Sequence, residues 1–307
     1  MESGTDMFDR VSEVLIEDET LRDGLQIEKR LFSVEEKLSL VAAIADAGVR
    51  RIQVGSFVHP GRVPQMANTD EVFARLAPRP GVTYTALILN RAGLDRAMTV
   101  GVRHLSMSVS ASETHSLRNA SKGVAEALAG MLPTIEAAMN AGIAVRAGIQ
   151  SALGCGFEGR IAIDQVLRIA RAYSAVGVEE INIADTAGLS NPKWTYEVCA
   201  RVADAVAPGT RLSLHLHDTR GLGIANMVAG LEAGVTIFDA AVGGLGGCPF
   251  IPSATGNIAT EDAVFALEEM GIRTSIDWRR LSAVTHRLET MLGRTLPGRL
   301  APLAEAA

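Results

Sequence analysis

The stretch RLSLHLHDTRGLGIANMVAGLEAGVTIFDAAV, residues 211–242, joins two kinds of hydrophobic pattern. An alternating apolar segment at Arg211–His217 is followed by a helix-like segment at Ile224–Ala233 and by a second apolar run at Ile237–Val242. Alternation predicts a strand, and helical spacing that ends at Gly234 predicts a helix with a left-handed C-cap. Strand, helix and strand in this order are typical of a parallel βα unit.

The same alternation runs along most of the chain. The expected strands are Val14–Glu19, Arg51–Gly55, Thr83–Ile88, His104–Ser110, Ala144–Gln150, Glu180–Asp185, Arg211–His217 and Ile237–Val242. Helical segments lie between them, among them Glu35–Ala47, Ala125–Ala141 and Asp164–Val176. Eight such units without a Pro/Gly/Ser-rich linker predict an α/β fold, a single (β/α)8 TIM barrel over residues 13–290 with tails at 1–12 and 291–307. A doubly wound sheet is the alternative, but no GxGxxG follows the first strand.

Composition limits the classes of function. The chain has 307 residues, 48% of them hydrophobic, and a net charge of −6, which argues against a nucleic-acid surface. The N-terminus is acidic and lacks the regions of a signal peptide, and no apolar run of about 18 residues occurs, so we expect a soluble cytoplasmic protein without a membrane span. Cys155, Cys199 and Cys248 form no CxxC, which indicates neither a disulfide framework nor a zinc cluster.

Polar residues gather where the predicted strands end. In a TIM barrel these ends share one rim, and reactive residues belong there. The rim segments are Glu19–Gly24, Gly55–Phe57, Ala184–Thr186, His215–Asp218 and Gly243–Cys248. His215 and His217 would point the same way from one strand and, with Asp23, would suit a divalent ion with open positions, Mg²⁺ or Mn²⁺ before Zn²⁺ or Co²⁺. The plainer interpretation is a pair of hydrogen-bonded histidines and a turn carboxylate.

Two further features are open to two interpretations. Asn257 precedes an expected helix at 258–270, so its amide is either a turn or helix-cap group or a ligand of the ion. The glycine run Gly243–Gly247 is either a tight barrel-closing turn or a loop that moves over a substrate. In the second case Cys248 would be a proton donor rather than a buried hydrophobe, whereas Cys155 and Cys199 are interpreted as buried.

Several stretches together resemble the hydroxymethylglutaryl-CoA lyases, metal-dependent enzymes built on TIM barrels. The resemblance covers about residues 14 to 290, and the His-x-His-Asp-Thr and Gly-Gly-Cys-Pro blocks are its most specific parts. The matching stretches are Arg22–Gln26, Glu28-Lys29, Ser56–Val58, Val63–Met66, Ala152–Cys155, Glu158-Gly159, Asp185-Thr186, His215–Thr219, Gly243–Pro249 and Ser253–Asp262.

The resemblance implies a retro-Claisen cleavage of a 3-hydroxyacyl-CoA to acetyl-CoA and a keto acid. It implies metal ligation by Asp23, His215, His217 and Asn257, with Asp23 or His215 as the base that takes the hydroxyl proton. Arg22 would bind the substrate carbonyl and offset charge on the enolate, and Cys248 would protonate that carbanion. Substrate contacts would also come from Gln53, Ser56, Lys29 at the CoA phosphates, and Asp185, which would orient Arg22 or a ligand. A homodimer or higher homo-oligomer is expected.

The chain departs from the family at three places. Ile52-Gln53 stands where the family has Ile-Glu, His59–Arg62 replaces Ser-Pro-Lys-Trp, and Cys155–Phe157 replaces Cys-Pro-Tyr. Smaller residues at a pocket rim admit larger groups, so a relative of the substrate with a different C3 substituent is the first alternative. A condensing synthase of the isopropylmalate or homocitrate kind is the second, because Asp18–Gly24 resembles it equally. A barrel that binds acyl-CoA without turning it over is the third, suggested only by Gln53.

Overall fold

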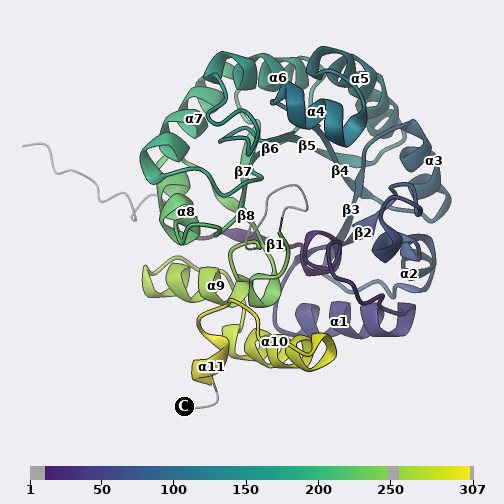
Figure 1. The fold of residues 1–307 in the computed structure, drawn as a ribbon, viewed down its shortest axis with the longest axis vertical. Coiled ribbons are helices and arrows are strands. Elements are labelled where there is room, and N and C mark those ends of the chain that lie inside the picture. Colours follow the sequence, from purple (N-terminus) through teal and green to yellow (C-terminus); the bar gives the residue numbers. More distant parts are fainter. Residues whose placement is uncertain (1–10, 248–255, 305–307) are drawn as a thin grey trace, which may run out of the picture.

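The computed structural model describes residues 11–247 and 256–304, which form the TIM barrel that the sequence predicts (Figure 1). Every strand pairs in parallel with its chain neighbours, and β1 pairs with β8 to close the ring. The strands are β1 (Leu15–Asp18), β2 (Arg51–Ser56), β3 (Thr83–Ile88), β4 (His104–Ser110), β5 (Ala144–Gln150), β6 (Glu180–Asp185), β7 (Arg211–Leu216) and β8 (Ile237–Ala240).

Helices cover the outside of the barrel in a ring (Figure 1). They are α1 (Val34–Asp46), α2 (Thr69–Arg75), α3 (Arg91–Thr99), α4 (Glu113–Ala120), α5 (Val124–Asn140), α6 (Ile163–Ala175), α7 (Pro192–Ala205), α8 (Gly223–Glu232), α9 (Thr260–Glu269), α10 (Trp278–Leu292) and α11 (Ala301–Ala304). Three glycines that follow Ala at helix ends, Gly48, Gly142 and Gly234, have φ of 104°, 74° and 86°. These values are the left-handed C-cap geometry that the sequence predicts.

The hydrophobic core lies between the strands and this helical layer. Cys155 and Cys199 belong to it, as expected from the sequence, and are 1% and 0% exposed. Burial raises the pKa of the Cys199 thiol to about 12, so this thiol stays protonated. Cys248 lies outside the described residues.

The interior of the barrel, by contrast, is polar. Side chains at i and i+2 point inward from each strand, as Arg51 and Gln53 do from β2 and Asn182 does with Glu180 from β6. Branched apolar residues usually fill this space in TIM barrels. Here ion pairs fill it instead, such as Arg146 with Asp239.

The segment after α10 returns to the rim of the barrel. The Gly298 amide donates to the Gly243 carbonyl at 3.0 Å, and Asp262 accepts bonds from the Arg299 and Leu300 amides at 2.8 and 3.0 Å. Leu296 is buried. Within the segment expected to be a C-terminal tail, residues 298–300 therefore contact Gly243, at the start of the glycine run, and Asp262 of α9.

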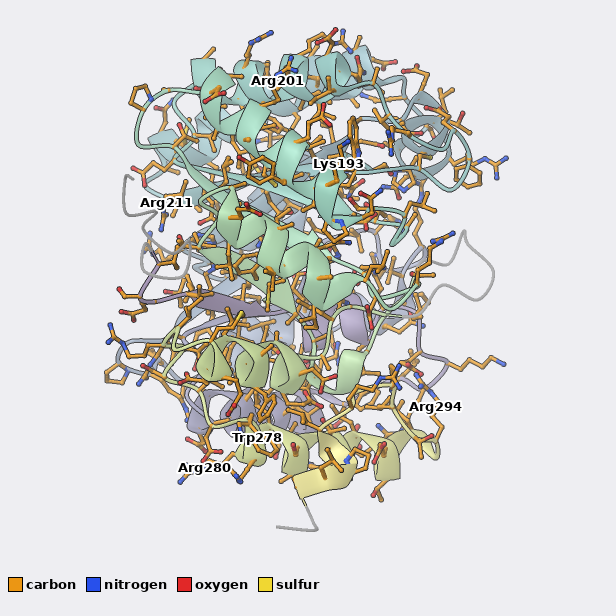
Figure 2. All side chains as sticks on the ribbon, turned by 90° about the vertical axis from the view of Figure 1, so that its left-hand side faces the viewer. Lys193, Arg201, Arg211, Trp278, Arg280 and Arg294 are labelled. Carbon is orange, nitrogen blue, oxygen red and sulfur yellow. The ribbon has the colours of Figure 1, made fainter. Side chains whose placement is uncertain are left out.

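The outer surface carries scattered charges. Figure 2 shows Lys193 and Arg201 on α7 in the upper part of the view, Arg211 at the start of β7, and Arg280 on α10 at the lower end. Among the described helices, none combines the length and the apolar character that a membrane crossing requires.

Candidate metal and substrate site

Two imidazoles and a carboxylate meet at the C-terminal end of the barrel. Nε2 of His215 lies 3.0 Å from Nε2 of His217, which is 3.4 Å from Asp23 Oδ2. His215 lies on β7 and His217 just beyond it, while Asp23 belongs to a single π-helical turn, Thr20–Gly24, after β1. All three residues are buried, and their ligand atoms lie within 4.8 Å of one another.

Asn257 completes this group from the other end of the chain. Its Nδ2 donates to Asp23 Oδ2 and to the Leu245 carbonyl, both at 2.9 Å. Its Oδ1 is buried and has no hydrogen-bond partner in the described structure. The helix-cap interpretation of Asn257 is wrong, because α9 begins at Thr260 and its N-cap is Ala259.

This donor set fits a divalent cation. Ligands at right angles around an ion at about 2.1 Å are roughly 3.0 Å apart, which is the separation of the two Nε2 atoms. The unpartnered Asn257 oxygen adds a neutral oxygen donor, and Asp23 adds a negative one. Burial disfavours the Asp23 carboxylate, but Arg22 and the two histidines outweigh it and hold its pKa well below the usual range, so Asp23 is ionised and ready to bind a cation.

Arg22 lies beside this group with its guanidinium fully engaged. It donates to Glu19 through Nη2, to Asp23 through Nη1 and to the Gln53 amide oxygen through Nε. Its side chain keeps 12% exposure, whereas Glu19 has none. A planar guanidinium held on three sides presents one orientation to a substrate.

Gln53 is buried under Arg22. Besides accepting from Arg22, its Nε2 donates to Glu17 Oε1 at 3.1 Å and to Ser106 Oγ at 3.0 Å. Because one end faces a donor and the other faces a carboxylate, the orientation of the amide is fixed. A Glu at this position would meet Glu17 with like charge, so the neutral amide suits its surroundings.

The other predicted substrate residues are Ser56, Lys29 and Asp185. Ser56 is buried at the end of β2, where its Oγ donates to the Leu87 carbonyl at 3.1 Å, and Lys29 is exposed. Asp185 accepts bonds from the Leu189 and Ser190 amides at 2.9 and 3.0 Å. Among the described residues, the hydrogen bonds of Asp185 hold the loop after β6, and none of them reaches Arg22.

Three residues that support the site from the barrel interior were not predicted as site residues from the sequence. They are Glu19, Asp239 and Arg146. Glu19 Oε2 and Asp239 Oδ2 lie 3.4 and 3.2 Å from His215 Nδ1. Arg146 Nη2 donates to Glu19 at 2.8 Å and Nη1 to Asp239 at 2.5 Å. A sign was available in the sequence, since each of these charges interrupts or ends an apolar strand segment.

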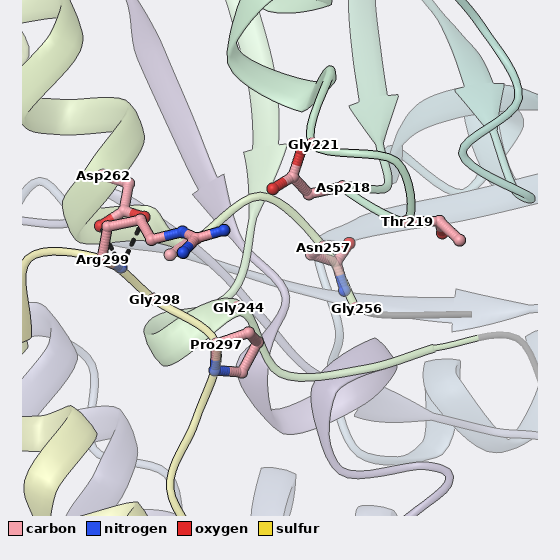
Figure 3. Close-up of a pocket in the computed structure, with 11 residues that line it drawn as sticks. Asp218, Thr219, Gly221, Gly244, Gly256, Asn257, Asp262, Pro297, Gly298 and Arg299 are labelled. Carbon is pink, nitrogen blue, oxygen red and sulfur yellow. Dashed lines mark hydrogen bonds between the residues drawn. The ribbon is translucent and has the colours of Figure 1, made fainter. Parts of the chain in front are cut away.

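A pocket of about 190 Å³ opens next to Asn257 (Figure 3). Its lining includes Asp218 and Thr219 on one side and Pro297 and Arg299 of the C-terminal segment on the other. Gly244 of the glycine run and Gly256, directly before Asn257, also line it. The site is thus bordered by the residues that follow β7 and by those that follow α10.

Comparison with known proteins gives consistent similarities. The family model described as HMGL-like matches residues 13–287. The hydroxymethylglutaryl-CoA lyase of Pseudomonas mevalonii is 40% identical over 275 residues, 89% of this chain and 90% of that protein. A 3-hydroxy-3-isohexenylglutaryl-CoA/hydroxymethylglutaryl-CoA lyase of Pseudomonas aeruginosa is 40% identical over 280 residues, 91% and 93% of the two chains.

A solved structure agrees with these relatives. An HMG-CoA lyase from Acinetobacter baumannii, in complex with coenzyme A and 3-methylmalate, has a TM-score of 0.90 and 36% identity. The match covers 95% of each chain.

Proposed function

The chain belongs to the HMGL-like family and is a hydroxymethylglutaryl-CoA lyase-like enzyme that cleaves an acyl-CoA to acetyl-CoA, and we propose which of its residues carry the reaction. The relatives named above are lyases, so the condensing synthase is not favoured. The meeting of Asp23, His215, His217 and Asn257 likewise speaks against a barrel that only binds.

Asp23, His215, His217 and Asn257 would hold the divalent ion. A bound ion supplies Lewis-acid stabilisation of negative charge on the substrate's hydroxyl oxygen. Mg²⁺ or Mn²⁺ is the proposed ion, because the set mixes oxygen and imidazole donors and leaves positions open for a chelating substrate. The 3.0 Å separation of the imidazole nitrogens and the unpartnered Asn257 oxygen support this assignment.

The cleavage needs a base, an electron sink and an acid. Asp23 or His215 accepts the proton of the C3 hydroxyl, the C3–O bond becomes a carbonyl, and the C2–C3 bond breaks. The electron pair of the broken C2–C3 bond passes into the thioester, which becomes an enolate. Cys248 then donates a proton to C2, which completes acetyl-CoA and leaves the keto acid as the second product.

Arg22 is the proposed partner of the developing enolate. Its guanidinium lies next to Asp23 and is held by Glu19 and Gln53, so it stays in place as charge builds on the thioester oxygen. Ser56 and Lys29 are proposed to contact the substrate, Lys29 at the CoA phosphates. Gln53 and Asp185 would act on substrate indirectly, through Arg22 and through the loop after β6.

The observation that carries the assignment is the meeting of His215, His217, Asp23 and Asn257 beside Arg22. The test is product analysis on hydroxymethylglutaryl-CoA after removal of metal with EDTA. Acetyl-CoA and acetoacetate should form only after Mg²⁺ or Mn²⁺ is restored. Metal-independent cleavage would contradict the proposed role of this site.

A larger C3 substituent is the second candidate for the substrate. It is favoured by Gly61 and Gly156, which stand where the family carries larger residues, and by the P. aeruginosa relative whose name includes an isohexenyl substrate. Parallel assays with methyl and isohexenyl thioesters decide between the two. Activity confined to the methyl compound would rule out the larger substituent.

We further propose a cytoplasmic homodimer or higher homo-oligomer, as the sequence resemblance implies. Cell fractionation tests the location, and light scattering of the purified protein tests the oligomeric state.

A further inference from the structure

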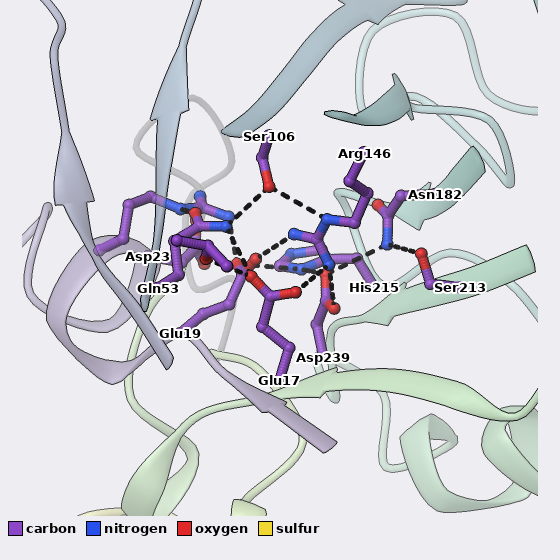
Figure 4. A network of polar contacts seen from close by, with 12 residues as sticks. Glu17, Glu19, Asp23, Gln53, Ser106, Arg146, Asn182, Ser213, His215 and Asp239 are labelled. Atoms are coloured by element: carbon purple, nitrogen blue, oxygen red, sulfur yellow. Dashed lines mark hydrogen bonds and ion pairs between the residues drawn. The ribbon is translucent and has the colours of Figure 1, made fainter. Parts of the chain in front are cut away.

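A continuous set of charged side chains fills the barrel below the candidate site (Figure 4). Arg146 is at its centre and pairs with three carboxylates, Glu17 at 3.0 Å, Glu19 at 2.8 Å and Asp239 at 2.5 Å. These residues come from β1, β5 and β8 or from the residue directly after β1. They are between 0% and 3% exposed, so they act on the site only through the residues that they touch.

Within this set, Glu19 is the carboxylate that lies next to both Arg22 and His215. Its Oε1 accepts from Arg146 Nη2, which fixes the carboxylate against the barrel interior. Its Oε2 accepts from Arg22 Nη2 and lies 3.4 Å from His215 Nδ1. One oxygen atom therefore faces both the substrate-side arginine and a histidine of the metal set.

Within the described part of the chain, Asp239 and Gln53 each contact one of those two groups. Asp239 Oδ2 lies 3.2 Å from His215 Nδ1, and its other oxygen is held by Arg146. Gln53 accepts from Arg22 Nε, and its amide nitrogen goes to Glu17 and Ser106. Asp239 thus supports the histidine, and Gln53 supports the arginine.

We propose that Glu19 is a positioning residue shared by Arg22 and His215, so that one buried carboxylate orients both the substrate-binding arginine and a metal-binding histidine. This rests on the proposed function for the roles of those two residues. A carboxylate at Nδ1 fixes the tautomer and leaves the Nε2 lone pair free for an ion. The same carboxylate helps to fix the plane of the guanidinium, which sets where the exposed part of the group points.

Three variants separate these effects. Asp239→Asn should weaken Mn²⁺ binding, measured by calorimetry on the metal-stripped protein, with little change in KM at saturating metal. Gln53→Met should leave Mn²⁺ affinity within about twofold and impair kcat/KM. Glu19→Gln should weaken Mn²⁺ binding and also impair kcat/KM, with a loss of about tenfold or more in metal affinity.

The matched control is Glu180→Gln. Glu180 is as deeply buried and accepts two 2.8 Å bonds from Arg51, but it contacts neither Arg22 nor His215 in the described structure. Its loss should lower the melting temperature and leave Mn²⁺ affinity unchanged. This control separates shared positioning from a general effect of removing an interior charge.

The outcomes are distinct. Unchanged Mn²⁺ affinity in folded Glu19→Gln, or equal loss in Glu180→Gln, would overturn the proposal. If Glu19→Gln does not fold, Glu19→Asp, which keeps the charge on a shorter side chain, should show the same joint loss to a smaller degree. If the wild-type protein binds Mn²⁺ yet cleaves no 3-hydroxyacyl-CoA, the proposed function fails while the metal arm of the test still decides the role of Glu19 toward His215.

Discussion

Asp23 and Asn257, 234 positions apart in the chain, are joined by a 2.9 Å hydrogen bond from the Asn257 amide nitrogen to the Asp23 carboxylate. The bond fixes the Asn257 amide next to the Asp23 carboxylate, and the amide oxygen has no hydrogen-bond partner among the described residues. A turn after the first strand and a loop after the last strand are thereby held at one point.

Replacing Asn257 with Ala should weaken Mn²⁺ binding by at least about tenfold, because it removes both an oxygen donor and the bond that orients Asp23. Calorimetric titration measures the change. Asn90→Ala is the control: Asn90 caps α3 by accepting from the Gly93 amide at 3.0 Å, so its loss should cost about 1 kcal/mol of stability and leave metal affinity intact.

Gly246→Ala should damage the site without unfolding the barrel. A Cβ there would lie 2.6 Å from Asn257 Nδ2 and 3.1 Å from Asp23 Oδ2, at a φ of +110°. We expect at least a tenfold loss of kcat/KM, since catalytic geometry tolerates little displacement. The control is Gly271→Ala. Gly271 also has a positive φ, +77°, but an added Cβ would meet nothing within 4 Å, so this variant should lose some stability and no activity.

Stability should fall as pH rises from about 4.5 to 7, in part because of Glu261. Burial raises the pKa of its carboxyl to about 7, despite bonds from the Gly243 amide and Thr285. Because the folded-state pKa lies above the unfolded value of 4.5, this contribution to stability is complete below about pH 4.5, is lost as pH rises toward 7, and stays constant at higher pH. The loss attributable to Glu261 is about 3 kcal/mol.

Glu261→Gln should therefore flatten the dependence of unfolding free energy on pH, as urea titrations between pH 4 and 8 can measure. Part of the slope should remain, because burial also raises the pKa of Asp18 to about 6. A slope equal to that of the wild type would show that Glu261 titrates normally.

Cys248→Ala should stop turnover while leaving metal binding in place. Loss of a general acid costs about 100-fold or more in kcat. Mn²⁺ affinity should stay within twofold, since a thiol is absent from the proposed ligand set. The control is Cys199→Ala, inside α7 and fully buried, which should lower the melting temperature slightly and keep kcat.

Much of the fold follows from hydrophobic pattern alone. The four strands Thr83–Ile88, His104–Ser110, Ala144–Gln150 and Glu180–Asp185 have the bounds that the pattern predicts. The first and last strands are shorter than predicted. Glu19 begins to turn toward the helical Thr20–Gly24, and Gly243, with a φ of +66°, places Val242 in a 3-10 turn. Local backbone geometry of this kind leaves little trace in an apolar pattern.

The metal set could be predicted from sequence because His215 and His217 share one strand face and Asp23 follows another strand at the same rim. The supporting charges could not be predicted in the same way. Glu19, Arg146 and Asp239 meet only because the closed barrel brings β1, β5 and β8 within reach of one another across its interior. Their pairing depends on register across the barrel, which a single sequence does not display.

Pairing of β1 with β8 has a consequence for how the protein is made. During synthesis β1 can pair with β8 only after some 220 further residues have been made, and the ring can close only then. Since Asp23 and Asn257 come from the two sides of that closure, an ion can meet the full ligand set only in a completed barrel. Ion binding would then report the final step of folding, and by mass action it would slow the reopening of the ring.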